Sequence, residues 1–375
     1  MNICNLEKIL AENNQPKFRL EQIKKAVFQE GISSFSEIST LSKELRNLLE
    51  RELKILSFIP EKVLSAQDGL SVKAVLKLED GNFIETVLMS AREGNWSVCV
   101  SSQVGCPLGC AFCATGEGGF KRNLTSEEMT DQVLFWKQYL KKLQISKSKF
   151  QTLPTCLPDR QAGRRVNPKL KIKNSKLRNY DVSNIVYMGM GEPFLNFENV
   201  KVSILSLIDP KLFGFGARSI SVSTSGVSAG IEKMAEGLPQ INLAVSLHFA
   251  DNILRSKYMP INRKFDLEVL RQALKKYFLK SRRKVMLEYI MLSGINDSLE
   301  DAKKLAVYLR SIEKLQLLHV NLIKYNSTSG KFSGSRPETM RKFKDCLLQS
   351  GINTTIRKSL GSDIQGACGQ LAGKN

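Results

Sequence analysis

The feature of this sequence that most constrains its fold is a series of short apolar segments, each separated from the next by a polar loop and a helical stretch. Seven such segments follow one another along the chain: 96–102, 183–191, 217–226, 242–248, 285–292, 319–326 and 353–358. Regular alternation of strands with helices is typical of a parallel sheet covered by helices. The sequence therefore predicts an α/β fold, a partial or full (β/α) barrel whose functional side chains gather at the C-terminal ends of the strands.

The 375 residues are enough for one large domain with a smaller one attached. Residues 1–75 read as short amphipathic helices and are expected to form a helical accessory domain. Residues 76–96 continue an alternating pattern around Asp80-Gly81, which predicts a β-hairpin linker. Residues 97–375 are expected to form the barrel.

A formal net charge of +20 predicts a polyanionic partner, because such an excess of positive charge concentrates nucleic acid around the protein. Basic residues concentrate between Lys141 and Arg178 and again from Arg255 to Lys284. Residues 145–181 also contain three prolines and do not fit the strand and helix alternation. We expect an exposed basic insertion there, either a loop that grips RNA or a spacer.

The cysteine content and the hydropathy of the sequence indicate the cellular compartment of the protein. The eight cysteines are too sparse for a secreted disulfide scaffold, and no apolar run approaches the ~20 residues of a membrane-spanning helix. We therefore expect a soluble cytoplasmic protein without a membrane partner, and nothing in the sequence demands more than a monomer.

Three cysteines, Cys106, Cys110 and Cys113, lie in the segment GCPLGCAFC with C-x3-C-x2-C spacing. A structural zinc site typically has four protein ligands. After these three cysteines, neither a further cysteine nor a histidine follows within about forty residues. Three thiolates can instead hold a [4Fe-4S] cluster whose fourth iron is open to another ligand. The spacing therefore favours an iron–sulfur cluster over zinc and over three unrelated thiols.

Polar and glycine residues follow several of the predicted strands. Gly189 and Gly191 allow close approach of the backbone to a ligand, and Glu192 can pair with an ammonium group. Taken singly, these residues are equally typical of a glycine turn with a structural glutamate.

The motifs GCPLGCAFC, YMGMGEPFLN, SVSTSG, AVSLH, NLIKYN and ACGQLAG together resemble the radical S-adenosylmethionine (radical-SAM) RNA adenine methyltransferases of the RlmN and Cfr type, over residues 71–373. The resemblance implies a [4Fe-4S] cluster on the three cysteines, S-adenosylmethionine as the second cofactor, and an N-terminal domain that binds RNA. It also implies contacts to S-adenosylmethionine from one set of residues: Gly191, Glu192, Ser223, Ser246, Leu247, His248 and Asn326.

The same resemblance implies a covalent relay. The C2 carbon of adenine has no lone pair with which to attack a sulfonium methyl group, so direct polar transfer fails. In the family, the cysteine at the position of Cys368 is methylated by a first S-adenosylmethionine, and a second is cleaved to a radical that activates the S-methyl group. The methyl carbon then joins protein to RNA. Cys99 matches the thiol that resolves this thioether, and Glu85 matches the proton acceptor.

The expected activity is formation of 2-methyladenosine in 23S rRNA and in tRNA, with two S-adenosylmethionine molecules per turnover and a flavodoxin-type electron donor. Methylation of C8 of the same adenine is the alternative product. Two further classes compete: a non-catalytic iron–sulfur RNA-binding protein, which needs neither Cys99 nor Cys368, and a radical-SAM enzyme acting on another protein, for which the charge offers no reason. Cys4, Cys156 and Cys346 have no predicted role, and Arg357 and Lys358 are candidates for phosphate contact.

Overall fold

The computed structural model describes residues 1–92, 94–150, 181–328 and 330–373. Of the expected basic insertion at 145–181, residues 151–180 lie outside the described residues.

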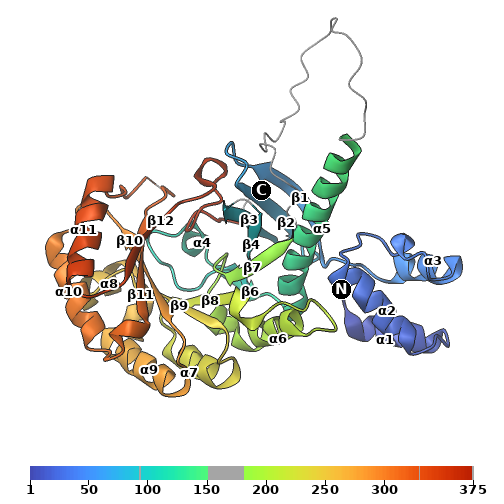
Figure 1. Ribbon diagram of the computed structural model, residues 1–375, viewed down its shortest axis with the longest axis horizontal. Helices are drawn as coiled ribbons and strands as arrows, with labels where there is room; N and C mark the ends of the chain where they lie inside the picture. Colours follow the sequence, from blue (N-terminus) through green and yellow to red (C-terminus); the bar gives the residue numbers. More distant parts are fainter. Residues whose placement is uncertain (93, 151–180, 329, 374–375) are drawn as a thin grey trace, which may run out of the picture.

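The N-terminal region begins with helices α1 (Ile3–Glu12), α2 (Phe18–Lys24) and α3 (Lys43–Glu52). Their apolar faces meet around Leu6, Ile23 and Leu49, which are fully buried. This helical region packs on the rest of the protein, since the Phe28 ring lies 5.0 Å from that of Phe213. Figure 1 shows it as a separate group of blue helices beside α5 (Ser126–Phe150).

The helices end at Glu52, so the expectation that helical structure continues to residue 75 is wrong. Strand β1 (Phe58–Ser65) follows and pairs antiparallel with β2 (Ser71–Leu78). Pro60 disfavours a helix there, and it is tolerated because β1 is an edge strand of the sheet. The pairing register shifts between Pro60 and Lys62.

The hairpin around Asp80-Gly81 consists of β2 and β3 (Phe83–Arg92), with Gly81 at a positive φ of 80°. Strand β3 then pairs antiparallel with β4 (Asn95–Cys99), the first strand of the barrel. The hairpin and the barrel are therefore parts of one continuous ten-stranded sheet, in the order β1-β2-β3-β4-β7-β8-β9-β10-β11-β12.

The seven strands from β4 onward are parallel and adjacent in chain order. They coincide with the seven apolar segments of the sequence: β4, β7 (Val182–Tyr187), β8 (Ile220–Thr224), β9 (Asn242–Ser246), β10 (Val285–Met291), β11 (Leu318–Lys324) and β12 (Thr354–Arg357). Within the described residues β12 has one strand partner, β11, so the barrel is partial. The predicted parallel α/β architecture is confirmed.

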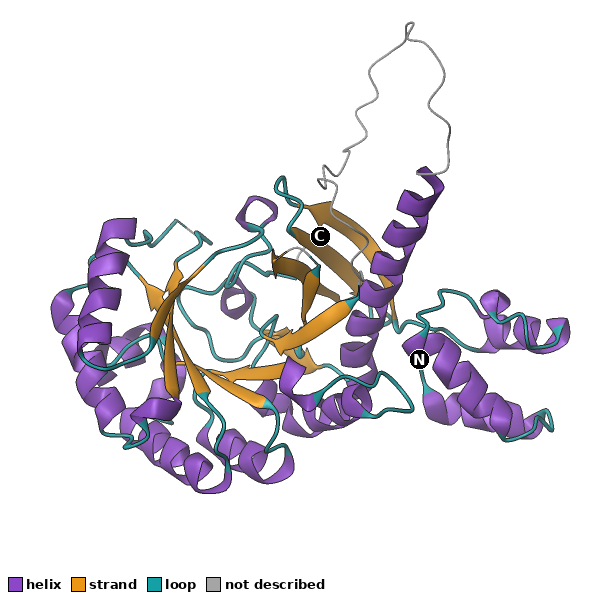
Figure 2. Ribbon diagram, viewed as in Figure 1, coloured by secondary structure: helices purple, strands orange, loops and turns teal. Residues whose placement is uncertain are grey.

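Helices cover the outer face of this sheet, as Figures 1 and 2 show. They are α6 (Phe197–Ile208), α7 (Ser228–Gly237), α8 (Asn252–Tyr258), α9 (Leu267–Lys280), α10 (Leu299–Arg310) and α11 (Pro337–Gln349). Their inward faces and the sheet form the main core, while the opposite face of the strands points toward the inside of the partial barrel.

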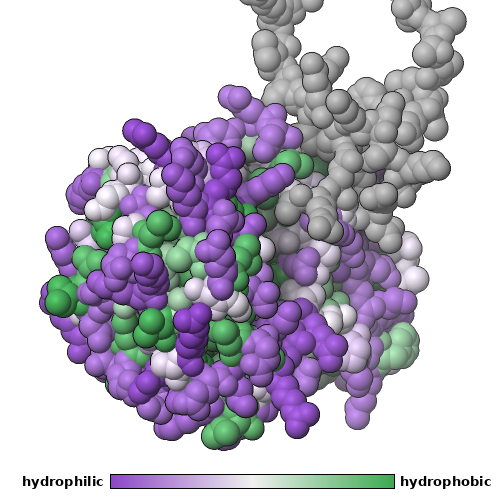
Figure 3. All heavy atoms as spheres, turned by 60° about the vertical axis from the view of Figure 1, so that its left-hand side comes forward, coloured by the Kyte–Doolittle hydropathy of each residue, from purple (hydrophilic) through white to green (hydrophobic). Residues whose placement is uncertain are grey.

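The outer surface carries much of the charge. Figure 3 shows that hydrophilic side chains predominate on one face and that hydrophobic ones are interspersed among them. Among the described helices, none combines the length and the hydropathy needed to cross a bilayer.

Candidate active site at the strand ends

The three clustered cysteines lie in a loop between two short antiparallel strands, β5 (Gln103–Gly105) and β6 (Phe120–Asn123). The loop closes where the Cys106 amide donates to the Gly119 carbonyl at 2.8 Å. Gly105 has a φ of 76°, and a Cβ there would lie 1.9 Å from the Gly119 oxygen. Only glycine fits this position, so the approach of the two loop ends depends on it.

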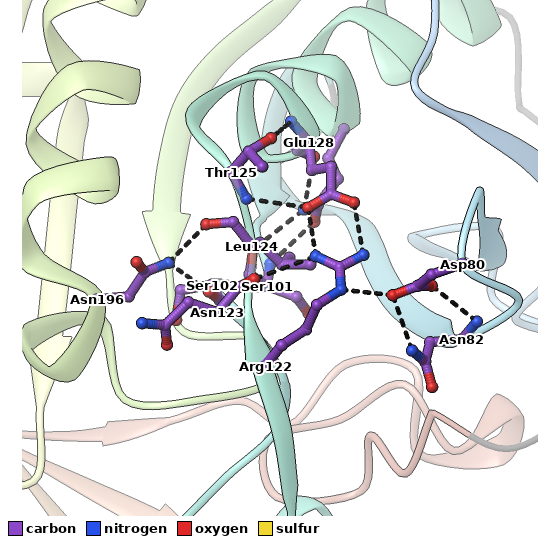
Figure 4. A network of polar contacts seen from close by, with 11 residues as sticks. Asp80, Asn82, Ser101, Ser102, Arg122, Asn123, Leu124, Thr125, Glu128 and Asn196 are labelled. Carbon is purple, nitrogen blue, oxygen red and sulfur yellow. Dashed lines mark hydrogen bonds and ion pairs between the residues drawn. The ribbon is translucent and has the colours of Figure 1, made fainter.

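A polar network fixes the same loop from outside. The Arg122 guanidinium makes two 2.8 Å hydrogen bonds to the Glu128 carboxylate on α5 and also bonds to Asp80 in the hairpin turn (Figure 4). Hydrogen bonding to Arg122 lowers the pKa of Asp80. Asn196 donates to the carbonyls of Ser102 and Leu124, both at 2.8 Å. The loop is thus tied to the hairpin, to α5 and to the residues after β7.

The cysteines face a small apolar core of their own. Cys106 and Cys113 pack against it and Cys110 is part of it, together with Leu108, Phe112, Phe249, Met259, Ile290, Leu292 and Tyr325. Burial raises the pKa of the Cys106 thiol to about 12, and burial, followed by the charges of Cys113 and Cys106, raises the pKa of Cys110 well above its ordinary value. Thiols in such surroundings ionise when a bound metal compensates their charge.

The donor set fits a cluster better than a single ion. In the part of the chain that the structure describes, no three Cys, His, Asp or Glu side chains converge as the ligands of one metal ion must. The thiolates of an iron–sulfur cluster bind different iron atoms and are held farther apart. Cys106, Cys110 and Cys113 on one loop, with an apolar wall, are residues that could hold such a cluster.

The GEP segment follows β7 and lies against β5. Gly191 has a φ of 99°, and a Cβ there would lie 2.5 Å from the Gln103 side chain. Glu192 is 2% exposed, and its carboxylate accepts hydrogen bonds from the amides of Phe194 at 3.1 Å and Ser225 at 2.7 Å. Burial raises the pKa of Glu192, although these hydrogen bonds act in the opposite direction. A buried carboxylate held by backbone amides is suited to bind a ligand's ammonium group.

The ends of β8 and β9 lie beside this carboxylate. The hydroxyl groups of Ser223 and Ser246 are 3.5 Å apart, and both side chains are half-buried. Leu247 and His248 follow, and both of their amides donate to the Glu288 carbonyl on β10 at 3.1 Å. These two hydrogen bonds fix the sharp turn at His248, whose φ is 59°.

His248 is held as a neutral ring. Its Nδ1 accepts a hydrogen bond from the Ile290 amide at 3.1 Å, and its ring packs edge-on against Phe112 of the cysteine loop, 5.1 Å between centroids. Burial, followed by the charge of Arg255, lowers the pKa of His248 to about 3. The residue therefore acts as a hydrogen-bond donor through Nε2 and not as a cation.

The C-terminal segment brings Cys368 to the same end of the barrel. The Asn326 side chain, after β11, donates to the Cys368 carbonyl at 3.3 Å. On the other side, the Ala114 amide donates to the Gly369 carbonyl at 2.8 Å, directly after the last cysteine of the loop. The Cys368 thiol is accessible to solvent but enclosed on most sides, and this enclosure raises its pKa to about 11.

Cys99 and Glu85 lie across neighbouring strands. Cys99 pairs with Val87 in the β3–β4 ladder, so Glu85, two residues earlier on β3, points to the same face of the sheet as Cys99. Burial, then the nearby Cys368 charge, raises the pKa of Cys99 to about 12, while Arg357 acts in the opposite direction. The structure thus brings the two thiols within electrostatic reach of each other, with Glu85 on the same wall.

Three charged residues near the site make contacts that sequence reasoning missed. Arg255 is fully buried and bonds to the carbonyls of Ser225 and Leu247. Glu288, on the inner face of β10, bonds to Asn321 and to Arg357 at 3.4 Å. Lys73 is buried beside Glu85 and is described below. A charged residue within an apolar strand was the available signal for Lys73 and Glu288; Arg255 was read as part of a basic surface.

Comparisons with known proteins agree with this geometry. The family model of the Radical SAM superfamily matches residues 100–306, and that of the ribosomal RNA large subunit methyltransferase N-terminal domain matches residues 1–55. The crystal structure of a radical SAM methyltransferase from Sphaerobacter thermophilus superposes with a TM-score of 0.85 at 35% identity, covering 100% of this chain and 98% of that one.

Two full-length relatives are similar to the same degree. A probable dual-specificity RNA methyltransferase RlmN from Syntrophomonas wolfei is 38% identical, over 99% of this chain and 95% of its own length. A ribosomal RNA large subunit methyltransferase Cfr from Bacillus velezensis is also 38% identical, over 98% of this chain and 95% of its own.

Fold, cysteine loop and strand ends define a radical-SAM enzyme, whose cofactors are a [4Fe-4S] cluster and S-adenosylmethionine. Within that class, the chain belongs to the family of the RlmN and Cfr RNA methyltransferases.

Proposed function

We propose that this enzyme forms 2-methyladenosine in 23S rRNA, and also in tRNA, in the cytoplasm, acting as a monomer with a flavodoxin-type electron donor. The observation that carries the proposal is the approach of two thiols to within electrostatic reach of each other beside the cysteine loop: Cys99 from the first barrel strand and Cys368 from the segment after the last. A structural or sensory cluster needs neither thiol, so this arrangement favours catalysis over the non-catalytic alternative.

In this proposal Cys106, Cys110 and Cys113 hold the cluster. Glu192 binds the ammonium group of S-adenosylmethionine, and Gly191, which a side chain would push against Gln103, allows the segment that carries Glu192 to pack closely on β5. Contacts to the rest of that cofactor come from the neighbouring strand ends: Ser223, Ser246, Leu247, His248 and Asn326. Together the two cofactors supply methyl groups and the radical chemistry that activates an S-methyl group.

The chain's own residues carry the relay. Cys368 accepts a methyl group on its sulfur. Through this sulfur and the carbon of the former methyl group, protein and RNA are then joined. Once the unpaired electron that the addition leaves in the ring has returned to the electron-transfer system that supplied it, Glu85 takes the proton from C2 of the attached base. The Cys99 thiolate then attacks the Cys368 sulfur, so that a disulfide forms and the sulfur–carbon bond breaks. The electron pair of the broken sulfur–carbon bond goes to the methylene carbon, which is then protonated to give the product methyl group.

The test is nucleoside mass spectrometry of 23S rRNA and tRNA after anaerobic reaction of the cluster-loaded enzyme with deuteriomethyl S-adenosylmethionine and a flavodoxin reducing system. Labelled 2-methyladenosine, missing with Cys368→Ala and Cys106→Ala, is the expected result. Label in 8-methyladenosine would support the alternative product, which the equal similarity to a Cfr methyltransferase keeps open. No labelled nucleoside from an enzyme that cleaves S-adenosylmethionine would refute both.

A further inference from the structure

Lys73 on β2 is a buried lysine with an unusual set of partners. Its ammonium lies 3.1 Å from the Glu85 carboxylate, and the two side chains are 6% and 4% exposed. Lysine is almost never this buried unless it is paired. The same ammonium donates to the Gln365 carbonyl at 3.3 Å. The pair therefore lies between the hairpin and the segment that carries Cys368.

The strand register places this pair beside the thiols. Lys73 pairs with Val87 across β2 and β3, and Val87 pairs with Cys99 across β3 and β4. Side chains of residues that pair across strands lie on one face, so Lys73, Glu85 and Cys99 share one face of the sheet. Lys73 is thus separated from Cys99 by one side chain in the same row.

Both ends of the segment around Cys368 are attached to the pair. Glu85 accepts a 2.9 Å hydrogen bond from the Ala372 amide through its second carboxylate oxygen, while Lys73 binds Gln365. Ser101 also donates to the Glu85 carbonyl at 2.6 Å. Each oxygen of the carboxylate therefore has a defined partner, and its orientation relative to the Cys368 segment is fixed.

Stability alone is a weak reason for such a pair. Removing two charges from water costs about as much as their attraction returns, and apolar residues of similar volume often stabilise a protein equally well. What the ammonium does provide is a charge-assisted hydrogen bond of 3.1 Å that holds one carboxylate oxygen of Glu85 in a fixed direction.

We propose that Lys73 is a positioning residue for the proton-removal step, because its contacts to Glu85 and to Gln365 hold the Glu85 carboxylate in place and aim it at the base attached to Cys368. This inference rests on the proposed role of Glu85. In the step, the C2 proton moves to a carboxylate oxygen of Glu85 and the electrons of the broken C–H bond remain in the ring. Neutralised Glu85 then loses its attraction to Lys73, which retains the Gln365 carbonyl as a partner.

The experiment is an anaerobic single turnover with the holoenzyme and an RNA substrate, in which the covalent protein–RNA adduct is followed on denaturing gels over a range of pH. The variants are Lys73→Met, Lys73→Arg, Glu85→Gln and the double variant Lys73→Met/Glu85→Gln. The control is Lys77→Met, because Lys77 is four residues along the same strand and exposed. Methylation of Cys368 is measured separately by intact-protein mass spectrometry.

Lys73→Met should still acquire the methyl group on Cys368 and form the adduct, but the adduct should break down at least about tenfold more slowly at neutral pH. Lys73→Arg should recover part of the rate, and Lys77→Met should match the unmodified enzyme. Because Lys73 acts through Glu85, the double variant should be no slower than Glu85→Gln.

Two results separate the inference from the function on which it rests. If Glu85→Gln accumulates adduct while Lys73→Met resolves it at the normal rate, Lys73 has no positioning role and the assignment of Glu85 stands. If Glu85→Gln resolves the adduct normally, the role of Glu85 fails and the inference fails with it. Loss of Cys368 methylation in Lys73→Met would also overturn the proposal. Should Lys73→Met not fold, the double variant, which buries no unpaired charge, and Lys73→Arg still give the comparison with Glu85→Gln.

Discussion

The side-chain amide of Asn326 donates a hydrogen bond to the backbone carbonyl of Cys368 at 3.3 Å, which joins the end of β11 to the segment that carries the Cys368 thiol. Asn326 is 9% exposed and lies on the other side of Cys368 from the cysteine loop. The position of the thiol is therefore determined jointly by a barrel strand and by the loop proposed to hold the cluster.

Replacing Asn326 by Ala should reduce methylation of Cys368 more than it reduces stability. One hydrogen bond of this kind contributes about 0.5–1.5 kcal/mol, which corresponds to a rate loss of up to about tenfold. Intact-protein mass spectrometry after incubation with S-adenosylmethionine measures the effect. Lys324→Ala, an exposed position at the end of the same strand, is the control. Equal rates in both variants would contradict the prediction.

Glu192→Gln should weaken the binding of S-adenosylmethionine. The amide that replaces the carboxylate loses the charge that attracts the ligand's ammonium group, and charge-assisted hydrogen bonds contribute about 1.5–3 kcal/mol, or roughly ten- to 100-fold in affinity. Calorimetric titration of the anaerobic, cluster-loaded enzyme measures this loss. Glu198→Gln removes an exposed carboxylate on α6 and should leave affinity unchanged. If the two variants bind equally well, Glu192 does not contact the ammonium group.

Arg255→Met should destabilise the protein and disturb the S-adenosylmethionine site. The guanidinium donates to the Ser225 and Leu247 carbonyls on two neighbouring strand ends and also to Asn262 at 2.8 Å. Loss of these buried bonds should cost about 3–5 kcal/mol of unfolding free energy, measured by urea denaturation. Arg263→Met, at an exposed position, should cost less than about 0.5 kcal/mol. A loss below about 1 kcal/mol for Arg255→Met would contradict this account.

Stability should decrease as pH falls below about 6.5, partly because of His248. In the unfolded chain its imidazole binds a proton below its ordinary pKa of 6.5, whereas burial lowers the pKa to about 3 in the folded protein. The unfolded state thus binds more protons in this interval, and a neutral His248 contributes stability that is lost on acidification.

His248→Asn removes the titrating ring, so it should be less sensitive to pH. Between about pH 6.5 and pH 5 the loss of unfolding free energy should be smaller in the variant by about 2 kcal/mol. Urea unfolding of both proteins at the two pH values, with the same cluster content, gives the difference. Parallel losses in the two proteins would show that His248 is not the responsible group.

The strands were predictable because each carries its own signal, a short apolar run followed by glycine or a polar residue. The segment after Glu52 was not, because β1 is mostly exposed and exists as a strand only through its pairing with β2. The basic stretch that begins at Arg255 was read as surface, yet Arg255 is fully buried. Charge counts cannot distinguish the two cases, since burial depends on which carbonyl groups the fold brings within reach.

The residues of the candidate site also differ in how far the sequence alone could predict them. Cys106, Cys110 and Cys113 are close in sequence, so their spacing alone indicates a common ligand. Cys99 and Cys368 are far apart, and only resemblance to a family associated them. Lys73 was missed because its partnership with Glu85 arises from the register of β2 against β3, which the alternating pattern of the hairpin does not specify.

The continuity of the hairpin with the barrel limits how this enzyme can be recombined with others. Glu85 and Lys73 lie on the hairpin, the cysteine loop follows β4, and Cys368 lies beyond β12. A chimera that receives only the barrel strands of another radical-SAM protein would inherit the cofactor loop without the groups proposed to complete methyl transfer. On the proposed roles, a functional exchange would therefore have to carry Lys73, Glu85, the cysteine loop and the segment around Cys368 together.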